Sequence, residues 1–237
     1  MTQEYLASRW RAWMGAKLLQ TGATTIVLAV ISTVIVATAM LGAPDAGILP
    51  VFLSIPVILW LRGHRLRDIG LKRPVSWPRL LGTGLLIGLA AQLASLLLVN
   101  PLIEQFTRAP IDLSAFDSIR GNLKALLTLL AIVWAAAVFI EEIVFRGFLM
   151  TELKRLLGTN PAGLIMNLLL ASTLFGLAHW YQGLSGMIVT GLIGLVLGYL
   201  FIRQKFNLWL PILVHGFLNT AGLIFIYLDA DRYLERL

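Results

Sequence analysis

The chain has 237 residues, of which 58% are hydrophobic and 13% are charged, and its mean hydropathy is +0.84. A soluble domain carries about 25% charged residues, so the composition excludes an ordinary water-soluble globule and predicts an all-α, polytopic membrane protein. The net charge of +7 is typical of cytoplasmic loops rather than of a nucleic-acid partner, and the absence of cysteine excludes disulfides, thiolate metal ligands and a cysteine nucleophile.

The amino-terminal part predicts an anchor followed by two spans. Residues 1–20 mix cations with two tryptophans, which is typical of an amphipathic, interfacial segment. The apolar run 22–42 also resembles a signal peptide with a cleavage site at 37–39, but its length favours a retained span. A short turn then leads to a second span near 47–61.

A strongly basic loop over 62–79 separates the second span from a third at about 80–99. Residues 100–121 are weakly apolar and are expected to form a surface helix or a partial lid. A fourth helix begins near 122 and continues to about 156. The third span carries small residues on one face, which favours close helix packing: Gly84, Gly88, Ala91 and Ser95.

Three further spans are predicted, at about 161–180, 184–202 and 208–228. Residues 21–228 then form one transmembrane domain, and 229–237 form a short polar tail. The sixth span has small residues at every fourth position, a second packing ridge: Gly186, Thr190, Gly194 and Gly198.

The distribution of cations predicts the topology. With the amino terminus in the cytoplasm, thirteen lysines and arginines fall in cytoplasmic segments and five fall on the other side. The sequence therefore predicts about seven transmembrane helices with the carboxyl end outside, and an eighth helix, the alternative, would reverse the tail.

Residues 131–150 place Glu141, Glu142 and Arg146 inside an otherwise apolar run. A charge at mid-helix costs roughly 2.5–3.5 kcal/mol on insertion scales, so it needs a partner. Arg146 lies one turn after Glu142 on the same face. Glu141 points about 100° away and has no local cation, which makes it a functional candidate.

Two histidines and an asparagine lie in other spans: His179, His215 and, one turn later, Asn219. His64 lies in the basic loop and is expected to be solvated. From a turn near residue 158, Glu141 and His179 lie at similar heights, about 26–30 Å away. The sequence therefore predicts a site between helices four, five and seven.

These side chains suit the hydrolysis of an amide by water. A partly desolvated carboxylate gains basicity and can take a proton from water. A neutral imidazole can orient that water or bind a divalent metal, while a second ring and an amide N–H can stabilise an oxyanion. The signatures of serine-elbow hydrolases and zincins are absent from the sequence.

The three motifs EExxxR (141–146), FxxxH (175–179) and HxxxN (215–219), in this order on separate spans, resemble the CPBP family of intramembrane proteases. This family is also called the Abi or CAAX protease family, and it includes the type II CAAX prenyl endopeptidases. The general likeness runs from about 45 to 225, with a motif core at 122–228.

The resemblance implies a role for each matching residue. Glu141 would be the general base, with His179 helping to hold the water, while His215 and Asn219 would line the oxyanion side. Three further residues would support or shape the site: Glu142, Arg146 and Phe175.

The resemblance also implies partners and a location. The family is named for metalloproteases, so Zn²⁺ bound by Glu141, His179 and His215 is one expectation, and water alone at the site is the other. The expected substrate is a peptide or protein, as a C-terminal or membrane-embedded segment, reached among membrane lipids. The expected location is a bacterial or archaeal cytoplasmic membrane.

Two other classes of function remain open. A non-proteolytic membrane scaffold, or a bacteriocin-immunity-type protein, could retain the motifs for packing alone. A proton or ion pathway also uses intramembrane glutamate and histidine.

Overall fold

The structure, a computed structural model, describes residues 9–15, 21–74 and 76–230. Within these ranges the regular structure is helical and there are no strands, which confirms the all-α class. The expected interfacial segment 1–20 lies largely outside the described residues, although 9–15 is helical, and most of the expected tail 229–237 lies outside them as well.

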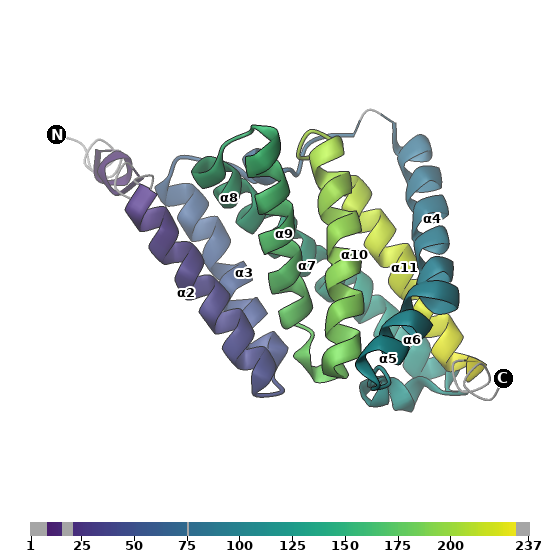
Figure 1. The fold of residues 1–237 in the computed structure, drawn as a ribbon. Helices are drawn as coiled ribbons and strands as arrows, with labels where there is room; N and C mark the ends of the chain where they lie inside the picture. The colour runs from purple at the N-terminus through teal and green to yellow at the C-terminus, as the bar shows by residue number, and fades with distance from the viewer. Residues whose placement is uncertain (1–8, 16–20, 75, 231–237) are drawn as a thin grey trace.

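The helices pack side by side in one bundle (Figure 1). The α-helices are α2 (Thr21–Met40), α3 (Pro44–Leu61), α4 (Trp77–Ala94), α5 (Asn100–Thr107), α6 (Leu123–Ile132), α7 (Phe139–Glu141), α8 (Met150–Leu157), α9 (Pro161–Leu177), α10 (Gly183–Arg203) and α11 (Trp209–Tyr227). Wider π-helical turns join some of them: η2 (Ser95–Val99), η4 (Val133–Val138) and η5 (Glu142–Leu149). Short 3₁₀ turns lie in the connections: η1 (Leu66–Ile69), η3 (Ser114–Ile119) and η6 (Trp180–Gln182).

Five helical segments of the described chain are long and apolar enough to cross a bilayer: Gly22–Met40, Trp77–Thr107, Leu123–Leu157, Trp180–Arg203 and Trp209–Tyr227. The other two expected spans coincide with shorter apolar helices, Ala46–Leu61 and Pro161–Leu177. The chain is an integral membrane protein, and the total of seven spans stays a prediction.

The expected boundaries of the third span were wrong. The helix does not end near 99 but continues through η2 into α5, so the first part of the segment 100–121 is helical. Pro101 lies directly after the π turn, inside this continuous helix. Ser95 Oγ donates to Asn100 Oδ1 at 2.8 Å across the π turn, so both polar residues lie within one continuous helix.

Small residues bring the helices together as predicted. In Figure 1, α9 lies beside α10, and α4 lies beside α11. A Cβ atom on Gly84 would lie 2.6 Å from Leu213 Cβ, and one on Gly88 would lie 2.8 Å from Phe217 Cβ. The stripe on α4 therefore serves close contact with α11, and Gly194 in the α10 ridge faces Phe175 of α9 in the same way.

Two connections meet at one end of the bundle. The backbone N–H of Leu208 donates to Gly70 O at 3.0 Å, and Lys72 Nζ donates to Lys205 O at 2.9 Å. These bonds join the basic loop after α3 to the turn between α10 and α11. The α8–α9 turn lies at the same edge in Figure 1, so the most basic connections share one side, and the assignment of that side to the cytoplasm stays a prediction.

Arg62 differs from the other cations of the basic loop. It is buried and forms an ion pair with Glu152, whose other carboxylate oxygen accepts from Arg155 Nη1 at 2.6 Å. This network ties the end of α3 to α8. The sequence analysis did not predict this ion pair because Arg62 and Glu152 are 90 positions apart in the sequence.

Two glycines on α4 test the packing with opposite expected signs. Gly88→Ala would place a Cβ against the α11 backbone, 2.8 Å from Val214 O, whereas Gly82 has nothing within 4 Å of its Cβ position. We expect Gly88→Ala to lower the free energy of unfolding by about 1–3 kcal/mol, as overpacking does. We expect Gly82→Ala to raise it by about 0.5–1 kcal/mol, because alanine favours the helix. Thermal unfolding in detergent measures both, and equal shifts would contradict the packing.

Candidate active site

The predicted carboxylates lie where the long rod 123–157 changes its helical geometry. Glu141 is the last residue of the short helix α7, and Glu142 is the first residue of η5. One π-helical segment, η4, therefore lies before this pair, and a second, η5, begins at Glu142. π-Helical turns are rare and are frequent at functional sites, and here they change the direction in which successive side chains point.

Glu142 is fully buried and binds two donors from two helices. Its Oε1 accepts from Arg146 Nη1 at 2.8 Å and from His215 Nδ1 at 2.9 Å. The Glu142–Arg146 pair predicted from spacing is therefore present. The contact with His215 of α11 was not predicted, and it makes Glu142 the support of a catalytic candidate as well as the partner of a cation.

Arg146 completes this network with contacts to α9 and α10. Its Nη2 donates to the carbonyl of Gly194 at 3.3 Å, and its guanidinium carbon lies 4.2 Å from the ring centroid of Phe175. A buried ion pair is stable only when its remaining donors are also satisfied. Hydrogen bonds and the aromatic face thus allow Arg146, 2% exposed, to stay charged inside the bundle.

The hydrogen bond to Glu142 determines the tautomer of His215. A carboxylate that already accepts from arginine is ionised, so Nδ1 of His215 carries the hydrogen that it donates. In the neutral ring, Nε2 is then an acceptor. It lies 3.9 Å from Oε2 of Glu141, a distance that a single water molecule can bridge.

His179 lies beyond the end of α9 rather than inside it, which corrects the predicted span to 180. The helix ends at Leu177, and His179 begins the 3₁₀ turn η6. Its Nδ1 lies 2.9 Å from the carbonyl oxygen of Phe175 and donates to it, and the two rings pack edge to face at 4.8 Å. Nε2 is thus again an acceptor in the neutral ring, and Glu141 and His215 lie within electrostatic range.

Glu141 and Asn219 keep their polar groups available. The Glu141 side chain is 15% exposed, and its Oε2 lies 3.9 Å from His215 Nε2. His179 and Arg146 also lie within electrostatic range of it. Asn219 is half-buried on α11, one turn after His215. The structure thus brings Glu141, Glu142 and both histidines together around Phe175, whereas no hydrogen bond recorded for the described residues joins Asn219 to them.

The ring tautomers resemble those of metal ligands, but the ligands do not converge. Metal-bound histidines donate their second N–H to a carboxylate or a carbonyl, as His215 and His179 do here. Among the described residues, however, no three His, Cys, Asp or Glu side chains gather closely enough to hold an ion.

Trp134 forms a contact to α11 that the sequence analysis missed. Its indole N–H donates to Thr220 Oγ1 at 2.9 Å, and Thr220 donates to the Gly216 carbonyl at 2.7 Å. A Cβ on Gly216 would lie 2.3 Å from the indole ring. Trp134 thus packs against Gly216 and Thr220, the residues that directly follow His215 and Asn219. In the sequence, its position seven residues before Glu141, about two helical turns away, was the one indication of this contact.

Residues 123–221 match the family model described as type II CAAX prenyl endopeptidase Rce1-like. This segment of the chain is therefore similar to the CAAX protease family. The matched segment runs from α6 into α11 and contains every residue of the candidate site, so the resemblance inferred from the motifs is confirmed. Comparisons with curated proteins and with solved structures give no match.

The buried charges of this CAAX-protease-like core should be coupled in their effect on stability. Arg146→Met leaves Glu142 ionised and short of a partner, which we expect to cost about 3–5 kcal/mol of unfolding free energy. Adding Glu142→Gln removes the stranded charge and should restore part of that loss. Thermal unfolding of the single and double variants measures the coupling, and strictly additive losses would contradict it.

The Trp134 contact should affect activity more than stability. Trp134→Phe and Thr220→Val each remove the same hydrogen bond, for an expected cost of about 0.5–1.5 kcal/mol in stability. Because the contact orients His215 and Asn219 relative to Glu141, we expect kcat to fall while KM stays unchanged. The double variant should be no slower than either single variant. Trp60→Phe, at an exposed position of α3, is the matched control, and equal effects of Trp134→Phe and the control would remove the assignment.

Proposed function

We propose that this protein is an intramembrane endopeptidase in which Glu141 activates a water molecule to hydrolyse a peptide bond. Similarity to a protease family supports peptidase activity in general. The identity of the base rests on one observation: Glu142 Oε1 pairs with Arg146 at 2.8 Å and with His215 at 2.9 Å, whereas the ion-pair contact of Glu141 within the described residues is the longer one to His215 Nε2, at 3.9 Å.

The proposed reaction begins with a water between Glu141 and the acceptor nitrogen of His179. Glu141 takes one proton from it, and the hydroxide attacks the carbonyl carbon of the scissile bond. The amide of Asn219 and the Nε2–H of a protonated His215, its charge balanced by Glu142, donate to the oxyanion. Glu141 then gives its proton to the leaving nitrogen, the C–N bond breaks, and a carboxylic acid and an amine are released.

This assignment uses His215 differently from a simple neutral donor. With Nδ1–H held by Glu142, a neutral ring has no hydrogen on Nε2 to offer an oxyanion. A donor role toward the oxyanion thus requires a hydrogen on both ring nitrogens. Glu142 is then a positioning residue, and its loss should impair His215 rather than Glu141.

The proposed substrate is a peptide or protein segment at its C-terminus or within the membrane, reached from the surrounding lipids. A prenylated tail is the substrate class that the matched family's description names, and for this chain it is one candidate. The proposed location is a cytoplasmic membrane of a bacterium or archaeon, with the amino terminus in the cytoplasm, as the distribution of cations favours.

Zinc remains a proposal with its own test. Glu141 and the free nitrogens of His179 and His215 are the residues that would hold it, and bound zinc would polarise the water. Isothermal titration of zinc into the purified protein should then show one site that is lost in His179→Ala. If the site binds water alone, the titrations of the two proteins will be identical.

Replacement of the proposed base tests the function directly. We expect Glu141→Gln to lower the rate of cleavage by about 10²- to 10⁴-fold, because the amide cannot accept the proton of water. Peptidomics of membranes that contain wild type or variant identifies the cut segments, and synthetic peptides then give rates. Glu104→Gln, outside the site, is the matched control. Equal cleavage by wild type and Glu141→Gln would refute the mechanism, and no cleavage by the wild type would favour a scaffold.

A further inference from the structure

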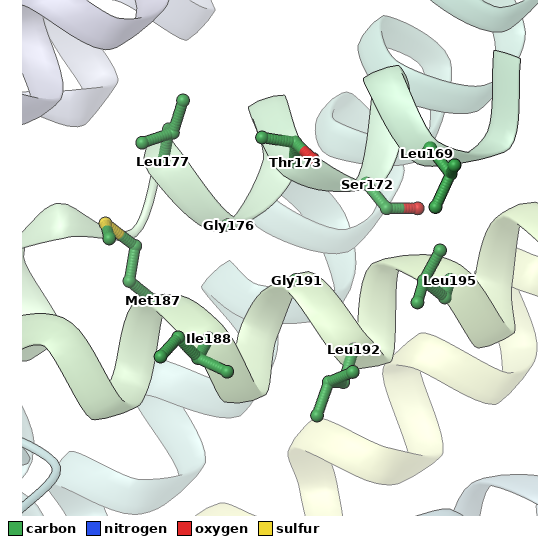
Figure 2. A pocket seen from close by; sticks show the side chains of 10 residues that line it. All are labelled: Leu169, Ser172, Thr173, Gly176, Leu177, Met187, Ile188, Gly191, Leu192 and Leu195. Atoms are coloured by element: carbon green, nitrogen blue, oxygen red, sulfur yellow. The ribbon is translucent and has the colours of Figure 1, made fainter. Parts of the chain in front are cut away.

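A groove follows the outer side of the seam between α9 and α10. It has a volume of about 270 Å³, and residues of these two helices alone line it. Gly176 and Gly191 form its floor, where the two backbones are closest: a Cβ on Gly176 would lie 3.1 Å from Gly191 Cα. Figure 2 shows leucine, isoleucine and methionine side chains along its rims, so the groove is almost entirely apolar.

One polar side chain in the groove is buried without a partner. Ser172 is 4% exposed, and its hydroxyl forms no hydrogen bond. Serine in a helix commonly donates to the carbonyl four residues earlier, and Ser172 does not. In Figure 2 its oxygen points into the gap between the helices, toward Leu169 and Leu195, so the groove lacks a hydrogen-bonding group that would complete it.

The position of Ser172 along α9 predicts that the groove lies near the middle of the bilayer. Ser172 is eleven residues beyond the start of α9, about 16 Å along a hydrocarbon layer about 30 Å thick. The rim residues Leu169 and Leu192 are 48% and 39% exposed. A phospholipid carries its polar groups at the surface, so an acyl chain would leave the Ser172 hydroxyl unpaired.

We propose that this groove docks a membrane-spanning α-helix of another protein, one that carries a hydroxyl or amide side chain at mid-membrane depth. Helices associate in lipid where small residues allow close approach and where serine, threonine or asparagine side chains bond across the contact. Gly176 and Gly191 supply the first condition and Ser172 the second. The dock does not depend on the peptidase activity, because its contacts exclude the Glu141 site.

The dock also lies close to that site. Leu177, at one end of the groove, is two residues before His179. On the inner side of the same seam, the Gly194 carbonyl accepts from Arg146. Only α9 and α10 would thus separate a docked helix from the Glu142–Arg146 ion pair.

Cysteine cross-linking tests the dock without background, because the natural chain has no cysteine. Full-length Thr173→Cys at the groove rim is reconstituted in liposomes with a Lys-flanked poly-leucine peptide that carries one cysteine and one central serine. We expect disulfide cross-linking about threefold above that of an all-leucine peptide, the average effect of one interhelical hydrogen bond in a membrane. Leu86→Cys, exposed on α4, is the control position.

Two further variants separate the contributions. Ser172→Ala should abolish the preference for the serine peptide, and Gly191→Leu should fill the groove and abolish cross-linking at residue 173. Thermal unfolding verifies that both variants fold, and the Glu141→Gln background should leave the result unchanged even if the peptidase assignment fails. Equal cross-linking at 173 and 86, or a preference that survives Ser172→Ala, would overturn the dock. Cross-linking of Thr173→Cys to itself, or none to either peptide, would assign the groove to a second copy or to lipid.

Discussion

The carboxylate of Glu142 is the interaction on which the arrangement of this bundle depends. One oxygen accepts from Arg146 on its own helix and from His215 on α11. Arg146 in turn contacts Phe175 of α9 and the backbone of α10. A charge in this setting is tolerated only while all its partners are in place. The network thus favours one mutual arrangement of four helices, and apolar side chains alone would permit several.

Two adjacent glutamates have opposite environments because a helix turns by about 100° per residue. Glu142 points into the packed interior, where its Oε1 accepts from Arg146 and His215, whereas Oε2 of Glu141 lies 3.9 Å from His215 Nε2. The two glutamates therefore have different roles. Glu142 binds Arg146 and His215, and Glu141 remains available to exchange a proton. The backbone, rather than residue type, makes this division.

Local patterns predicted what depends on local geometry. The helices, the Glu142–Arg146 spacing and the small-residue stripes follow from periodicity along one helix. The contacts of Glu142 with His215 and of Trp134 with Gly216 depend on how two distant helices are rotated about their axes, which no spacing reveals. The π turns around Glu141 shift that rotation further. For the same reason, the sequence placed Arg62 among the cations of the basic loop and gave no sign of its ion pair with Glu152 of α8.

The glycine ridge on α10 links packing to chemistry. Spacing alone indicated a surface for close contact, and Gly194 does lie against α9, where a Cβ would be 3.2 Å from Phe175. The same residue offers its carbonyl to Arg146. A side chain at 194 would move α10 away from Phe175 and lengthen that hydrogen bond, and the guanidinium would then be less able to hold Glu142 beside His215. The lack of a side chain at Gly194 therefore serves two purposes. It allows α10 to pack against Phe175, and through Arg146 and Glu142 it helps to orient the ring of His215.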